Sequence, residues 1–101
     1  MRTETTDGKT VIYLDGRISS VNAEQVQEEL TDAIAAAPST EILFEAKDLE
    51  YISSAGLRVL LTVAQEQQDH MSIRNVSPEI YEIFEMTGLT EILDVTQKSE
   101  E

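Results

Sequence analysis

The sequence predicts a mixed α/β domain, in which helices pack on a sheet that begins with an N-terminal β-hairpin. Two observations favour this fold class. Short apolar or β-branched runs of strand length alternate with longer segments whose apolar residues recur at helical spacing. In addition, Asp7-Gly8 separates the first two strand-like segments, and this pair suits the tight turn of a hairpin. The predicted order is β-β-α-β-α-β-α-β, and right-handed crossovers would place the helices against the sheet.

The hairpin is expected to join segments 2–6 and 9–15. The second segment is the better strand, because residues 11–14 are β-branched, aromatic or apolar, and Gly16 is expected to end it.

A helix is predicted over residues 23–36. Asn22 is expected to cap it, with Gln25 three residues later, as in a capping box. Val21 is expected to pack against Val26 as a hydrophobic staple.

A buried strand and a second helix follow. Residues 42–44, Ile-Leu-Phe, form the short continuous apolar run that is typical of a strand buried on both faces. After a loop, an inner apolar stripe predicts a helix over 54–68, whose polar end leads to His70. Residues 71–76 are the next candidate for a core strand.

The last helix is expected to begin at residues 77–79, where Ser-Pro-Glu provides a hydroxyl cap, a proline in the first turn and an acid near the positive helix end. Its buried side is predicted to comprise Ile80, Ile83, Phe84 and Met86. Gly88 suits a left-handed C-terminal cap, with Leu89 packing back over the last turn. A final strand is expected over 91–95, and residues 96–101 form a polar tail.

The charge balance argues against several classes of function. The 101 residues include 7 basic and 20 acidic side chains, which gives a formal net charge of −13. This disfavours a general nucleic-acid binder and a polybasic membrane attachment, because both select for Lys and Arg. The polar N-terminus and the lack of a long apolar run lead us to expect a cytoplasmic protein without a membrane segment.

Few residues could carry catalysis or hold a metal ion. The chain has no cysteine, and His70 is its only histidine. Its four glycines are isolated, and the common phosphate-binding and zinc-binding motifs are missing from the sequence. We therefore expect no enzymatic activity, no cofactor and no metal.

One stretch, residues 48–57, has the composition of a functional site. It places Ser53 and Ser54 at the start of a helix that follows a buried strand, where free N–H groups and the helix dipole favour an anion. A phosphate on either serine would therefore meet a favourable field. The small residues Ala55 and Gly56 are expected to leave this helix start open to a partner. The structural interpretation, in which either serine is only a helix cap, stays open.

Three segments carry a resemblance to a known family. The first is Asp48-Leu49-x-Tyr51-Ile52-Ser53-Ser54-Ala55-Gly56-Leu57-Arg58-x-Leu60-Leu61, and the others are Leu14-x-Gly16-Arg17-Ile18 and Ser77-Pro78 through Phe84-x-Met86-Thr87-Gly88-Leu89. In order and spacing they resemble STAS domains, and most closely the stand-alone bacterial anti-sigma factor antagonists. The resemblance covers most of the chain and implies a single STAS-like domain over 1–101, with a STAS-like mixed sheet.

The resemblance implies partner switching in transcription regulation. In this family the unphosphorylated antagonist binds an anti-sigma factor and so frees a sigma factor. In many members the anti-sigma factor is also an ATP-dependent serine kinase that phosphorylates the antagonist and expels it, and a serine phosphatase resets the cycle. The family's phosphoserine lies two residues before the motif glycine, which is Ser54 here.

The chain departs from the family pattern close to this serine. Many members carry Asp at the positions of Ser53 and Ser19. Both differences remove negative charge expected near Ser54 and make Ser53 an alternative acceptor.

The partner-binding surface is expected at the carboxyl ends of the parallel strands, where binding loops lie in such sheets. The loops 16–22 and 51–56 should then share one face. The predicted partner-binding residues are Gly16, Arg17, Ser19, Ser53, Ser54, Ala55, Gly56 and Arg58.

Other functions remain as alternatives. A STAS-like sensor or scaffold subunit would bind a protein assembly or a small ligand without a phosphoryl cycle. An acyl carrier protein also presents a serine at a helix start, but it would be all helical, and the strands expected at 11–14 and 42–44 argue against it.

Overall fold

The computed structural model describes residues 2–6, 8–36, 41–67 and 71–97 and confirms the mixed α/β class. Its main sheet has five strands in the order β1-β2-β4-β6-β7. Their bounds are Thr3–Thr6, Lys9–Tyr13, Glu41–Glu45, Met71–Val76 and Asp94–Gln97. β1 and β2 pair antiparallel, as the predicted hairpin requires, and the other pairs are parallel. Gly8 has the positive φ of 78° expected in the hairpin turn, whereas Asp7 lies outside the described residues.

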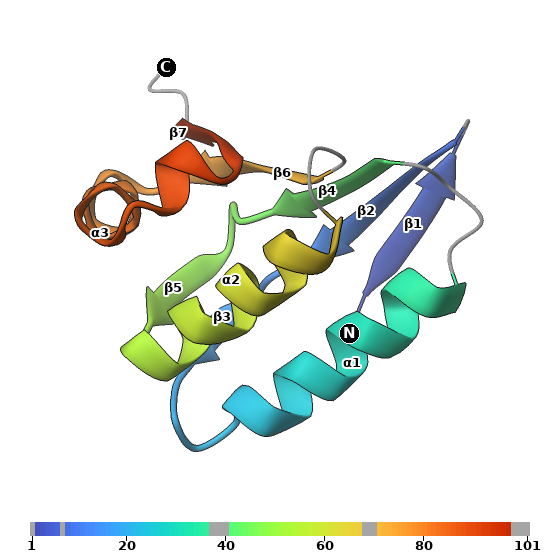
Figure 1. The fold of residues 1–101 in the computed structure, drawn as a ribbon, viewed down its shortest axis with the longest axis horizontal. Helices are drawn as coiled ribbons and strands as arrows, with labels where there is room; N and C mark the ends of the chain where they lie inside the picture. Colours follow the sequence, from blue (N-terminus) through green and yellow to red (C-terminus); the bar gives the residue numbers. More distant parts are fainter. Residues whose placement is uncertain (1, 7, 37–40, 68–70, 98–101) are drawn as a thin grey trace.

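Two long helices form a layer on one face of this sheet. α1 (Ala23–Ala36) and α2 (Ser54–Gln67) lie side by side, and α3 (Pro78–Thr87) stands apart from them, at the β7 end of the sheet (Figure 1). The largest fully buried side chains of the core include Ile12, Leu14, Leu30, Phe44, Leu60, Ile73 and Phe84. Residues 42–44 are buried throughout, as expected for a strand covered on both faces. The expected end of the second helix at 68, and His70, lie outside the described residues.

Two short strands that the sequence did not predict form a second sheet. β3 (Gly16–Ile18) pairs in parallel with β5 (Leu49–Ile52). We expected Gly16 to end a strand, but with φ of 74° it turns the chain from β2 into β3. The residues of β5 were expected to form a loop. Strands of three and four residues are too short for an alternating pattern to be recognised, and they form because Ile18 and Ile52 are both buried beneath α2.

The start of α1 differs from the predicted capping box. The Asn22 side chain accepts a hydrogen bond from the Ser19 backbone N–H (2.8 Å) and donates one to the Arg17 carbonyl (2.9 Å). It therefore closes the preceding loop. The prediction of a hydrophobic staple is wrong, because Val21 is 93% exposed while Val26 is buried.

The α3 segment follows its sequence signals at both ends. At the start of the helix, Ser77 Oγ accepts a hydrogen bond from the Ile80 N–H at 3.4 Å. At its end, Gly88 adopts a φ of 80° and its N–H donates to the carbonyls of Phe84 and Glu85. Met86 was expected to be buried but is 78% exposed. Its position six residues after Ile80 places it on the opposite side of the helix from Ile80 and Phe84.

The final strand begins later than predicted. A short 3₁₀ helix, η2 (Leu89–Glu91), follows Gly88, and hydrogen bonds from residues 92 and 93 to the Leu89 carbonyl continue the turn. The strand expected at 91–95 is therefore found at Asp94–Gln97, and it includes the first two residues of the expected tail. Residues 98–101 lie outside the described part of the chain.

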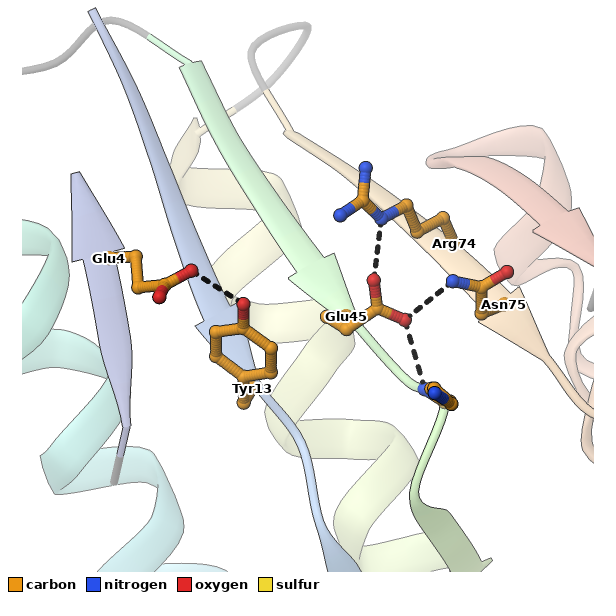
Figure 2. A network of polar contacts seen from close by, with 6 residues as sticks. Glu4, Tyr13, Glu45, Arg74 and Asn75 are labelled. Atoms are coloured by element: carbon orange, nitrogen blue, oxygen red, sulfur yellow. Dashed lines mark hydrogen bonds and ion pairs between the residues drawn. The ribbon is translucent and has the colours of Figure 1, made fainter. Parts of the chain in front are cut away.

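A polar network joins strands on the sheet face opposite α2 (Figure 2). The Glu45 carboxylate accepts hydrogen bonds from Arg74 Nε (2.6 Å), Asn75 Nδ2 (2.7 Å) and the Lys47 backbone N–H (3.1 Å). Asn75 adopts a positive φ of 60°, which asparagine tolerates better than most residues. The network thereby fixes the end of β4, from which the chain leaves for β5.

Figure 2 also shows a second pair on the same face. Tyr13 Oη donates to Glu4 Oε1 at 2.6 Å. Arg2, which the figure does not label, stacks on the Tyr13 ring with its guanidinium carbon 3.9 Å from the centroid. The pKa of the Tyr13 phenol is raised. The larger cause is the hydrogen bond to the Glu4 carboxylate, and the next is desolvation.

The Glu45 network predicts an acid-sensitive contribution to stability. Burial by itself would raise the pKa of Glu45, but the hydrogen bonds from Asn75 and Arg74, with the Arg74 charge, lower that pKa below its usual value. A lowered pKa stabilises the fold above the unfolded-state pKa, and this contribution is lost as the pH falls through the folded-state pKa. Glu45→Gln should therefore reduce the free energy of unfolding by about 1–2 kcal/mol at pH 7, and by less at pH 3.

Urea unfolding at both pH values measures this difference. Glu41→Gln, which changes an exposed carboxylate of the same strand, is the matched control and should have little effect at either pH. An equal loss of stability in the Glu45 variant at both pH values would contradict the assignment.

Candidate phosphorylation and partner-binding site

The structure gives the two serines at the start of α2 different roles. Ser53 is the single residue between β5 and α2, and its backbone N–H donates to the Ile18 carbonyl at 2.9 Å. Its Oγ accepts from the Gly56 N–H at 3.3 Å, so Ser53 caps the helix. Ser54 is the first helical residue and is exposed, and within the described ranges its hydroxyl has no hydrogen-bond partner. The capping interpretation therefore applies to Ser53, and the Ser54 hydroxyl is accessible.

Gly56 has a different role from the one expected for it. It is buried, and a Cβ at this position would lie 2.7 Å from Ile18 Cγ2, 2.7 Å from Ile52 Cγ1 and 3.1 Å from the Ile18 carbonyl oxygen. The glycine thus allows α2 to pack closely on β3 and β5. Ala55 is half-buried against the core. The expectation that Gly56 opens the helix start to a partner is wrong, because this residue faces the interior.

The loop after β3 lies beside the serines, as the topology predicted. The hydrogen bond from the Ser53 N–H to the Ile18 carbonyl joins the end of β3, where this loop begins, to the start of α2. Within the loop, Ser19 is half-buried and its Oγ accepts from the Val21 N–H at 3.3 Å. Val21 itself projects into solvent, and it was not predicted as part of this surface because its sequence position suggested a hydrophobic staple. The two loops therefore form one surface at this end of the molecule.

An exposed cation–aromatic pair flanks this surface. Arg17 of β3 and Tyr51 of β5 are paired in register, and the Arg17 guanidinium carbon lies 4.4 Å from the centre of the Tyr51 ring. Arg17 is exposed, and Tyr51 is 40% exposed. Sequence reasoning did not select Tyr51, since its alignment with Arg17 depends on the unpredicted β3–β5 pairing.

Arg58 lies one turn after Ser54 and borders a groove. The groove has a volume of about 220 Å³ and lies between α2 and the residues at the end of α3 and the start of η2. Its lining residues are Ser54, Leu57, Arg58, Leu61, Thr87 and Leu89. Thr87 and Leu89 come from a segment that the sequence offered only as a helix end, so this groove was not foreseen. Ser54 and Arg58, in contrast, were both predicted and are brought together.

In the ranges 2–6, 8–36, 41–67 and 71–97, no group of three His, Asp or Glu side chains is placed to hold a metal ion. Across the same ranges, the helices are too short or too polar to cross a bilayer. The chemical group that the site presents is the Ser54 hydroxyl, flanked by Arg58 and by the loop after β3.

Comparisons with known proteins agree with this architecture. A protein of Bordetella bronchiseptica named "Putative anti-sigma factor antagonist BtrV" is 34% identical over 97 residues, covering 93% of this chain and 83% of the relative. An anti-sigma factor antagonist from Mycobacterium paratuberculosis has a similar fold, with a TM-score of 0.83 at 18% identity, covering 94% and 82% of the two chains. The phosphorylated form of the Bacillus protein SpoIIAA gives a TM-score of 0.70 at 23% identity, covering 98% and 91%.

The family model of the STAS domain matches residues 1–101. Together with the mixed sheet, the two helices on one of its faces and the serine at the start of α2, this match identifies the chain as a member of the STAS domain family.

Proposed function

We propose that this chain is an anti-sigma factor antagonist whose unphosphorylated form binds an anti-sigma factor and thereby releases a sigma factor. The observation that carries the proposal is the exposed Ser54 hydroxyl, which is free of the capping role that Ser53 performs. The names of the relatives support the same assignment. The alternative of a scaffold or sensor without a phosphoryl cycle makes no use of this exposed hydroxyl.

Phosphorylation of Ser54 is the proposed off-switch. A phosphate adds about −1.5 to −2 charges and three acceptor oxygens to the surface that the partner covers. Ser54 is the better acceptor of the two serines, because the Ser53 hydroxyl already accepts the Gly56 N–H. A solved phosphorylated form of SpoIIAA is consistent with a switch of this kind.

The cycle requires two further proteins. We propose that the anti-sigma factor is itself the serine kinase and supplies the ATP site, and that a separate serine phosphatase restores the hydroxyl. On this proposal the chain itself performs no catalysis and acts in the cytoplasm, where sigma factors and ATP are available.

A pull-down tests the function directly. The unmodified chain is expected to capture the anti-sigma factor from cells of its own organism, and the chain carrying phosphoserine at position 54 is expected to lose it. Intact-mass measurement of the endogenous protein should show a species heavier by one phosphoryl group. Equal capture by both forms would contradict the switch, and a protein that is never phosphorylated would favour the scaffold.

A further inference from the structure

We propose that Arg58 has two alternative ionic partners, a carboxylate of the anti-sigma factor when Ser54 is unmodified and the Ser54 phosphate when it is modified. We also propose that the adjoining groove receives an apolar side chain of the same anti-sigma factor. The inference rests on the function proposed above and specifies how the partner is recognised.

The four arginines of the chain differ in what their guanidinium groups contact. Arg2 stacks on Tyr13 and Arg17 on Tyr51, and Arg74 forms an ion pair with Glu45. Arg58 is exposed, and in the part of the chain that the structure describes no contact holds its guanidinium. In a chain with a net charge of −13, a cation without an internal partner at the mouth of a groove is suited to an acidic group from another molecule.

The spacing of Ser54 and Arg58 along α2 brings their side chains to one side of the helix. Ser54 and Arg58 are four residues apart in α2, so they lie on the same side of the helix and both line the groove. A phosphate on Ser54 comes within reach of the guanidinium, with the acidic group N-terminal to the basic one, which is the favourable order along a helix. The phosphate therefore competes with the partner's carboxylate for the same arginine.

Apolar side chains line the groove beside these two residues. Leu57 and Leu61 are only partly buried in the isolated chain, although they pack against the core. Ser54 is itself a lining residue, so a partner that contacts this serine lies next to the groove. The occupant that matches this site is an apolar side chain with a carboxylate nearby in the anti-sigma factor.

The phosphate contact is tested without any partner protein. The chain is prepared with phosphoserine at position 54, and the second pKa of the phosphate is followed by ³¹P NMR. In Arg58→Gln this pKa should be higher than in the wild type by about half a unit, because the guanidinium stabilises the dianion. Lys9→Gln removes the same charge at the amino end of β2 and should leave the phosphate pKa unchanged. Equal pKa values in the wild type and Arg58→Gln would overturn the intrahelical contact.

The partner contact is tested with the unphosphorylated chain and the purified anti-sigma factor. Arg58→Gln and Leu57→Ala should each raise Kd about fivefold. Lys9→Gln is the charge control. Ile34→Ala is the apolar control, because it truncates a partly buried residue on a different helix, α1. Wild-type affinity in the Leu57 or Arg58 variant would overturn the docking assignment. If the wild-type chain itself fails to bind, the proposed function fails, whereas the ³¹P result still decides the phosphate contact.

Discussion

Replacing Ser54 by aspartate is expected to raise the Kd for the anti-sigma factor about a hundredfold, equivalent to a loss of about 3 kcal/mol of binding free energy. The Ser54 side chain is exposed and lies on the wall of the groove, so the new charge falls within the proposed contact area. It must be desolvated there and meets acidic groups of the partner. Ser54→Ala should bind as the wild type does and should resist phosphorylation. Isothermal titration and kinase labelling measure the two properties.

Ser53→Ala is the matched control for this experiment. It removes the hydroxyl that accepts the Gly56 N–H and should lower the free energy of unfolding by about 1 kcal/mol. It leaves Ser54 in place, so labelling by the kinase should continue. If Ser54→Ala were still labelled at normal stoichiometry, Ser54 would be the wrong assignment.

Replacing Gly56 by alanine is the second change with a large expected effect. Alanine normally stabilises a helix interior relative to glycine by about 1 kcal/mol. Here the added methyl would approach two isoleucine side chains to 2.7 Å and the Ile18 carbonyl oxygen to 3.1 Å. The carbonyl belongs to the backbone and cannot rotate away, so α2 must move. We expect the free energy of unfolding to fall by about 2–3 kcal/mol.

The sign of the change in the Gly56 variant is the decisive observation in a urea titration. A gain in stability would show that the helix start can accommodate a methyl group, contrary to the packing described above. Gly88→Ala serves as the comparison, because its added Cβ would have no neighbour within 4 Å and any loss comes from its φ of 80°. Of these two variants, only Gly56→Ala should also weaken binding to the anti-sigma factor, because the added methyl group displaces α2 and Ser54 moves with the helix.

The predictable part of the fold consists of the elements whose apolar pattern extends over several turns or a full buried strand. α1, α2 and the buried strand β4 were predicted within a few residues, because their periodicity is local. β3 and β5 were missed because each depends on a partner strand 33 or 34 residues away, for example through the pairing of Ile18 with Ile52. The Glu45 network was missed for the same reason, since its partners Arg74 and Asn75 are 29 and 30 residues away.

The candidate site was predictable in its centre and unpredictable at its edges. Two serines followed by small residues indicated a helix start, and Arg58 follows Ser54 by one turn in the sequence itself. The wall formed by Thr87 and Leu89 depends on where the end of α3 packs, which no local pattern encodes. The error on Gly56 has a physical cause: a small side chain can mean either an open surface or a close internal contact.

The two hydrogen bonds of Ser53 also affect the expected kinetics of the proposed cycle. Ser53 is bonded to β3 through its backbone N–H and to α2 through its hydroxyl, and these two bonds hold the start of α2, where Ser54 lies, against β3. In the proposed cycle, a phosphate on this exposed residue would change the surface without requiring a rearrangement of this chain. The time needed to turn the signal on or off is then set by the turnover of the kinase and phosphatase and by the lifetime of the complex.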